Sequence, residues 1–130
     1  MQLEIITPEK VAVHKDVDSL VTPGEEGYFG VLPGHTPFLA LLGIGKIVYK
    51  SGGEEKFLAV NSGFIEVLPD RVIILTHSAE LADEIDGERA SEAQNRAMER
   101  LRSKSPDIDF ERVQAALARA INRLKIFKSI

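Results

Sequence analysis

The sequence predicts an all-β sandwich of two packed antiparallel sheets, with about ten strands, followed by a C-terminal antiparallel α-helical hairpin. Two observations indicate this division. The apolar period is two residues up to about residue 84 and becomes helical after about residue 86. The charge changes at the same place, because residues 1–87 hold 6 basic and 14 acidic side chains, whereas residues 88–130 hold 10 and 6. We therefore expect a β-sandwich domain over residues 1–84 and a helical hairpin domain over residues 85–130.

Short β-branched and aromatic runs mark the expected strands. Leu3 and Ile5 alternate with polar neighbours, as do Val11 and Val13. Later apolar runs are separated by segments with turn chemistry, namely Ser51-Gly52-Gly53, Asn61-Ser62-Gly63 and Pro69-Asp70. Many short strands at such spacing are typical of a sandwich or barrel. No helical segment interrupts this stretch, so nothing in it supports parallel crossover connections.

The rest of the chain has alanine-rich helical faces. Ala90, Ala93, Ala97 and Leu101 fall on one face of a first helix. A break follows over residues 103–107, and the second helix has apolar residues on one side. Three residues at this break could cap the second helix: Ser105, Asp107 and Asp109. Two helices joined by a short polar turn form an antiparallel hairpin. An isolated hairpin buries little apolar area, so its docking could be conditional.

Composition excludes several classes of protein and of site. The chain has no cysteine, which rules out disulfides and thiolate metal sites. Neither a signal peptide nor an apolar run of membrane-spanning length occurs, so we expect an intracellular, soluble protein without direct membrane insertion. His14, His35 and His77 are too scattered to indicate a metal site. There is no P-loop and no Gly-x-Ser-x-Gly motif, so we expect no catalysis and no metal requirement.

Residues 27–37 read Gly-Tyr-Phe-Gly-Val-Leu-Pro-Gly-His-Thr-Pro and form the most specific segment of the chain. Three glycines allow positive φ and two prolines lock φ, and the side chains between them are unusually apolar for a solvated loop. One interpretation is a pair of short strands joined by a Pro-Gly turn. The other is a rigid surface that a partner contacts.

Arginines form a stripe on each expected helix, beside the alanine-rich faces. The stripes consist of Arg89, Arg96 and Arg100 on the first helix and of Arg112, Arg119 and Arg123 on the second. Packing the hairpin therefore brings like charges together. A solvated basic face and an anion site both remain open, because guanidinium groups match phosphate oxygens in pairs. No aromatic stacking set accompanies these cations, so we expect no nucleic-acid partner.

Three motifs in order give the chain a family resemblance: the 27–37 segment, Gly43-Ile44-Gly45 and the run Ile85-Asp86-Gly87-Glu88-Arg89-Ala90. Together they closely resemble the epsilon subunit of the F-type ATP synthase, of the bacterial or plastid type, over essentially all 130 residues. The resemblance implies a non-catalytic rotor subunit of the central stalk. Its sandwich would bind the gamma subunit and the polar loops of the c-ring, with Glu26, Tyr28 and His35 near those partners.

The resemblance also implies a regulatory hairpin. Folded against the sandwich, the hairpin would permit ATP hydrolysis. Extended along gamma, it would block the rotor, and its basic second helix would suit an acidic segment of the catalytic beta subunits. The protein would lie peripherally at the cytoplasmic face of the inner membrane or at the plastid thylakoid equivalent.

ATP is the regulatory ligand that the Ile/Leu-Asp-x-x-Arg-Ala pattern implies. From residue chemistry alone, Asp86 is explained as a helix N-cap, but Arg89 is not, because a cation is disfavoured in a first helical turn. By resemblance, the nucleotide contacts are Ile85, Asp86, Arg89 and Ala90 of the motif, together with Glu80, Arg96, Arg119 and Arg123.

Two other function classes are open from the residues alone. One is a free-standing phosphate- or nucleotide-sensing binding protein that uses the arginine hairpin. The other is a small β-sandwich enzyme with His35 or His77 as base. Neither accounts for three motifs in order across the chain.

Overall fold

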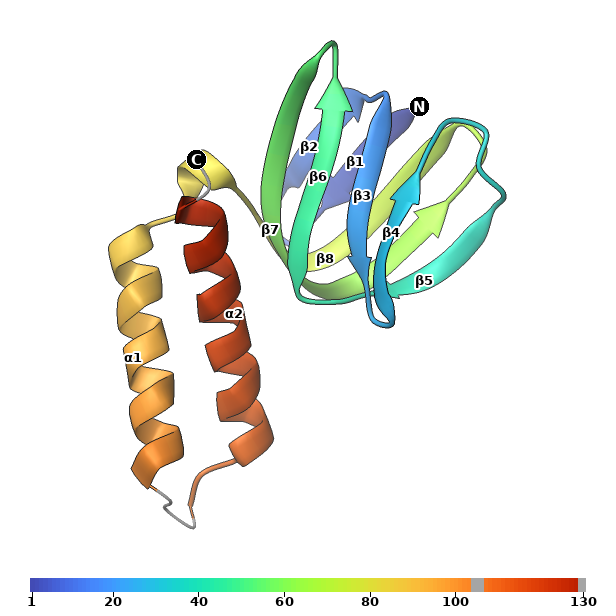
Figure 1. Cartoon of the computed structure of the whole chain (residues 1–130). Helices are drawn as coiled ribbons and strands as arrows, with labels where there is room; N and C mark the ends of the chain where they lie inside the picture. Colours follow the sequence, from blue (N-terminus) through green and yellow to red (C-terminus); the bar gives the residue numbers. More distant parts are fainter. Residues whose placement is uncertain (104–106, 129–130) are drawn as a thin grey trace.

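The computed structural model describes residues 1–103 and 107–128. The first part of the chain forms β1 (Gln2–Ile6), β2 (Val11–Asp16), β3 (Ser19–Gly24), β4 (Gly27–Val31), β5 (Phe38–Leu42), β6 (Gly45–Ser51), β7 (Glu54–Val67) and β8 (Arg71–Leu81). A short 3-10 turn, η1 (Ala82–Glu84), leads to α1 (Gly87–Ser103) and α2 (Phe110–Lys128). Figure 1 shows the strands wrapped into a two-layered sandwich with the helical hairpin beside it. The fold class predicted from the sequence is confirmed.

The strand pairing differs from the prediction in two details. The described residues form eight strands rather than about ten, in the order β2-β1-β8-β7-β5-β3-β4, with β6 pairing with β3 and β7. In addition, β1 pairs with β8 in parallel rather than antiparallel orientation. These two strands lie at opposite ends of the sandwich sequence, so the rest of the sandwich connects them in place of a crossover helix. A local apolar pattern identifies strands but not which strands lie side by side.

The predicted turn at residues 61–63 lies inside the long strand β7, where it is a local irregularity and does not reverse the chain. The ladder with β8 leaves out Ser62 and the opposite residue His77 without a change of register, and Ser62 has a φ of 46°. The next residue, Gly63, has a φ of 140°. The buried hydroxyl of Thr76 on β8 lies 2.9 Å from the carbonyl oxygen of Ser62 and 3.1 Å from that of Asn61. The strand therefore continues through this irregularity, pairing with β6 before it and with β5 after it.

The sandwich and the hairpin have separate apolar interiors. Large fully buried side chains fill the sandwich, including Leu3, Ile5, Leu20, Ile47, Leu58, Ile65 and Ile74. Between the helices, Ala90 and Ala97 of α1 are buried as predicted, with Val113 and Ala120 of α2. These small side chains allow close helix packing.

Aspartates begin both helices. The backbone N–H of Arg89 donates to Oδ1 of Asp86 at 3.1 Å, and that of Arg112 donates to Oδ1 of Asp109 at 3.2 Å. Both carboxylates thus act as N-caps, as the sequence predicted. The alternative cap at Ser105 lies outside the described residues.

Candidate functional site

The four motif residues at the start of α1 have different environments. Ile85 is buried and packs with Ala59 of β7 and Ile126 of α2 in a small cluster between hairpin and sandwich. Ala90 is fully buried, and Asp86 caps the helix. Arg89 is exposed and forms no ion pair within residues 1–103 and 107–128. Its guanidinium group and the exposed carboxylate of Asp86 are therefore the parts of the motif that a ligand can reach.

Glu80 and Arg123, far apart in the sequence, form a two-point ion pair between β8 and α2. Nε of Arg123 lies 2.7 Å from Oε1 of Glu80, and Nη2 donates to Oε2 at 3.0 Å. The Arg123 side chain is 25% exposed and the Glu80 side chain 32% exposed, and this partial burial limits the screening of the pair by solvent. A cavity of about 40 Å³ beside the pair is also lined by Arg119. It is much smaller than the roughly 300 Å³ or more of typical ligand sites.

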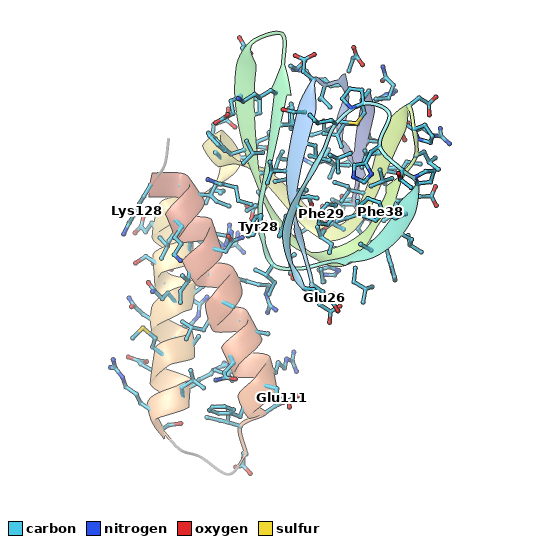
Figure 2. All side chains as sticks on the ribbon, turned by 45° about the vertical axis from the view of Figure 1, so that its right-hand side comes forward. Glu26, Tyr28, Phe29, Phe38, Glu111 and Lys128 are labelled. Carbon is cyan, nitrogen blue, oxygen red and sulfur yellow. The ribbon has the colours of Figure 1, made fainter. Side chains whose placement is uncertain are left out.

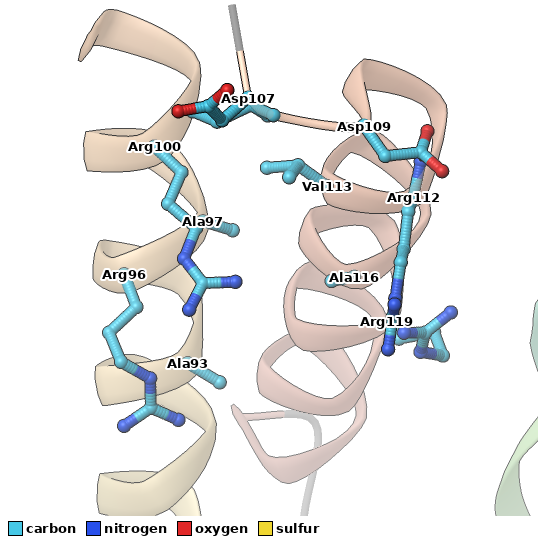
Figure 3. A pocket seen from close by; sticks show the side chains of 11 residues that line it. Ala93, Arg96, Ala97, Arg100, Asp107, Asp109, Arg112, Val113, Ala116 and Arg119 are labelled. Atoms are coloured by element: carbon cyan, nitrogen blue, oxygen red, sulfur yellow. The ribbon is translucent and has the colours of Figure 1, made fainter. Parts of the chain in front are cut away.

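A larger groove of about 660 Å³ runs between the two helices and is lined by four arginines. Figure 3 shows Arg96 and Arg100 on the α1 side and Arg112 and Arg119 on the α2 side, with alanines between them. In the described part of the chain, no carboxylate oxygen lies within 4.0 Å of a nitrogen of any of the four. Asp107 and Asp109 also line the groove, so four arginines against two aspartates leave it with an excess of positive charge.

The predicted nucleotide residues form a strip rather than one closed pocket. The start of α1 packs against the end of α2, since a Cβ atom on Gly87 would collide with the ring of Phe127. The structure brings Glu80 to Arg123, and it brings Arg96 and Arg119 to the same groove. Arg119 lines both the groove and the small cavity, so it connects the two parts. Arg89 does not line the groove.

The predicted partner residues Glu26, Tyr28 and His35 do not form one cluster. Glu26 precedes β4 and Tyr28 lies at its start, and both residues are labelled in Figure 2. His35 follows β4, so this strand, which spans about 17 Å, separates it from Glu26. The Nδ1–H of His35 donates to the carbonyl of Thr36 at 2.8 Å, and its ring centroid lies 5.2 Å from that of Phe38. His35 thus stabilises its own loop.

An exposed apolar row crosses five strands on the outer face of one sheet. The ladders place its members directly opposite one another, in the order Val11, Ile6, Leu75, Phe64 and Leu41. Phe64 is 52% exposed, and Leu75 and Leu41 are each 48% exposed. Sequence reasoning missed this row because its members lie in apolar runs that look like core. A signal was present, since Phe64 alternates in phase with the exposed Glu66 and out of phase with buried Ile65.

Comparison with known families decides the identity. Residues 1–82 match the family model of the ATP synthase delta/epsilon chain, beta-sandwich domain, and residues 83–128 match that of its long alpha-helix domain. The chain belongs to the ATP synthase epsilon family. It is 48% identical over 126 residues to the ATP synthase epsilon chain of Syntrophobacter fumaroxidans, covering 97% of this chain and 94% of the relative. For the epsilon chain of Bacillus cytotoxicus the identity is 45% over 124 residues, covering 95% and 93%.

Solved structures resemble this epsilon-family chain over its whole length. A chain of the Euglena gracilis mitochondrial ATP synthase, OSCP/F1/c-ring, has a TM-score of 0.70 and 27% identity, covering 97% of this chain and 76% of its own. A chain of the Tetrahymena thermophila mitochondrial ATP synthase central stalk and c-ring has a TM-score of 0.64 at 13% identity, covering 99% and 94%. The second likeness shows the fold alone.

As an epsilon subunit, the chain is a non-catalytic central-stalk component of an ATP synthase, which is a membrane-associated complex. The predicted family and the predicted role as a non-catalytic central-stalk subunit are thereby confirmed. Neither of the described helices is both long enough and apolar enough to span a bilayer. Among the described residues, no three His, Asp or Glu side chains gather as a metal site would require.

Proposed function

We propose that this epsilon subunit couples the gamma subunit to the polar loops of the c-ring through its sandwich, on the cytoplasmic side of the inner membrane or its plastid thylakoid equivalent. The two similar structures are of an OSCP/F1/c-ring assembly and of a central stalk with its c-ring. The observation that carries the proposal is the apolar row across five strands. Contiguous exposed apolar side chains on a soluble domain are typical of protein–protein contacts. Beside the row, Glu25 and Glu26 line a groove with Leu39 and Leu41, which offers polar contacts at its end.

Replacing Phe64 by glutamate tests the apolar row. The substitution places a charge at the centre of the proposed gamma contact, where it would be desolvated without a partner. We expect Phe64→Glu to lower the affinity for the gamma subunit at least tenfold in a pull-down titration, with an unchanged circular dichroism spectrum. Val21→Glu is the matched control, since Val21 is an exposed strand residue outside the row. Equal affinity of the Phe64→Glu variant and the wild type would contradict the proposal, and so would equal losses in both variants.

The hairpin is proposed to regulate ATP hydrolysis by moving between the folded position seen here and an extended position along gamma. The small number of contacts between the hairpin and the sandwich supports this role. Among the described residues, the polar contacts from the helices to the sandwich are the Arg123–Glu80 pair and a hydrogen bond from Asn122 to Gly45. Ile126 adds the main apolar contact. An extended α2 would offer its basic residues to acidic segments of the catalytic beta subunits.

ATP is proposed as the ligand that favours the folded hairpin, with no metal required. In the folded state the four groove arginines repel one another, and a polyphosphate chain would neutralise them. Arg89 forms no ion pair with any described residue, so its guanidinium group is available to the same ligand. A ligand that binds only the folded form shifts the equilibrium by its difference in affinity between the two states. Hairpin position would then depend on ATP concentration.

Calorimetric titration of ATP into the isolated protein, with and without magnesium, tests the nucleotide site. We expect saturable heat from the wild type and about tenfold or more weaker binding for both Arg89→Ala and Arg123→Ala. Arg89→Ala removes a charge-assisted hydrogen bond to the ligand, and Arg123→Ala breaks the ion pair with Glu80 that holds the hairpin in the folded state. Arg71→Ala is the matched control, since Arg71 is an exposed arginine of β8 outside the strip. Unchanged binding in both strip variants would remove the site. No heat at millimolar ATP would leave a rotor subunit whose hairpin does not respond to nucleotide.

A further inference from the structure

A single peptide group joins strand β4 to helix α2. The N–H of Lys46 donates to the hydroxyl oxygen of Tyr28 at 3.0 Å. The carbonyl of Gly45, in the same peptide group, accepts from Nδ2 of Asn122 at 2.9 Å. The described chain has no cis peptide, and in a trans peptide the N–H and C=O point in opposite directions. The Gly45–Lys46 peptide therefore lies between Tyr28 on one side and the hairpin on the other.

The Tyr28 hydroxyl takes the place of a missing ladder acceptor. The β3–β6 ladder runs from Ser19–Lys50 to Val21–Val48 and stops there. Farther along β3, the carbonyl of Pro23 already accepts from the N–H of Gly43 at 2.9 Å. The Lys46 N–H thus depends on a side chain, and leaving a backbone donor without a partner is costly.

Packing fixes Tyr28 against this peptide while leaving its other side open. Gly45 is buried, and a Cβ there would collide with the Tyr28 hydroxyl and lie 2.8 Å from Cβ of Pro23. Tyr28 is nevertheless 59% exposed. A bound partner can therefore reach the same side chain that completes the peptide contact. On the far side, Asn122 adjoins Arg123, which pairs with Glu80, so the Gly45 carbonyl belongs to the hairpin docking contact.

We propose that Tyr28 is a positioning residue that couples the β4 surface to hairpin docking through the Gly45–Lys46 peptide. Two hydrogen bonds on one amide polarise each other, so each strengthens the other. Loss or capture of the Tyr28 hydroxyl weakens the Asn122 contact and raises the undocked fraction of the hairpin. Because such coupling is reciprocal, undocking of the hairpin weakens the hydrogen bond between Tyr28 and the Lys46 N–H by the same factor in its equilibrium constant. This coupling acts within the chain and does not depend on which partner or nucleotide the subunit binds.

The test is a double-mutant cycle in the full chain with hairpin position as the readout. The chain has no cysteine, so Lys50→Cys and Glu99→Cys create a unique pair of exposed label sites on the sandwich and α1. Distances between spin labels at these sites give the docked and undocked populations. Tyr28→Phe removes only the hydroxyl, and Asn122→Ala removes the donor on α2. Tyr49→Phe is the matched control, because Tyr49 is the other tyrosine of the chain and lies outside this contact.

We expect Tyr28→Phe to raise the ratio of undocked to docked hairpin about fivefold, as the loss of a hydrogen bond does, and Asn122→Ala to raise it similarly. In the Asn122→Ala background, Tyr28→Phe should change the logarithm of the undocked-to-docked ratio by less than half of the change that it causes in the wild-type background. The cycle cancels the gain in helix propensity that alanine brings to α2. Additive effects, no effect of Tyr28→Phe, or an equal effect of Tyr49→Phe would each overturn the coupling. Circular dichroism checks that every variant is folded.

Discussion

At the scale of the residue, Gly63 shows how one position determines the shape of a strand. It has a φ of 140°, and a Cβ there would collide with the backbone carbonyl of Leu75 on β8. Backbone atoms of a central strand cannot move aside without breaking the ladder. Glycine is therefore required both by the dihedral angle and by the close approach of β8.

Gly63→Ala should cost about 3 kcal/mol or more in the free energy of unfolding, because it adds a steric collision to backbone strain. Gly27→Ala is the matched control, since Gly27 has a φ of 136° but no heavy atom within 4 Å of the position that an alanine Cβ would take. It should lose only the strain, about 1 kcal/mol. Urea denaturation measures both values, and equal losses would show that the collision at Gly63 is relieved by a shift of β8.

At the scale of the element, the start of α1 combines a structural cap with a proposed ligand site. The Asp86 carboxylate accepts from the N–H of Arg89, which explains its place in the motif without any ligand. Residue chemistry predicted the cap, and the family resemblance implied the ligand contact. The structure shows only the first, so the two roles must be separated by a substitution that keeps one of them.

Asp86→Asn separates these roles, because asparagine caps a helix about as well as aspartate but carries no charge. We expect Asp86→Ala to destabilise the protein by about 1 kcal/mol and Asp86→Asn to leave the stability nearly unchanged. Urea denaturation followed by circular dichroism gives both values. Asp83→Ala, at an exposed acid of η1, controls for the loss of a nearby charge. If Asp86→Asn were as destabilising as Asp86→Ala, the charge rather than the cap would hold the start of α1.

Elements with a strong local period were predictable from the sequence, whereas their interruptions were not. The alternation of Leu3 and Ile5 and the alanine face of α1 appear in the structure as expected. The segment at residues 61–63 has the composition of a turn, yet it forms only a local irregularity in β7, because β8 continues beside it in an unchanged register. Turn residues indicate that the backbone must bend, and the neighbouring strand decides whether the chain reverses.

At the scale of the whole molecule, contacts between distant segments are what the sequence could not reveal. The resemblance named Glu80 and Arg123 as members of one site, but no local pattern shows that they pair with each other. The apolar row has members on five strands, so it exists only once the register of all of them is set. The same holds for the parallel pairing of β1 with β8 and for the peptide between Tyr28 and Asn122.

The position of β8 within the sheet determines how the sandwich bears a mechanical load. This strand leads through η1 into the hairpin, and it lies between antiparallel β7 and parallel β1. A pull on the hairpin along the strand axis loads the hydrogen bonds on both sides of β8 in shear, so the rungs must yield together rather than peel one by one. The hairpin is thus tethered to an interior strand of the sheet. Tension from the rotating central stalk would therefore act on an interior strand of the sandwich and not on an edge strand.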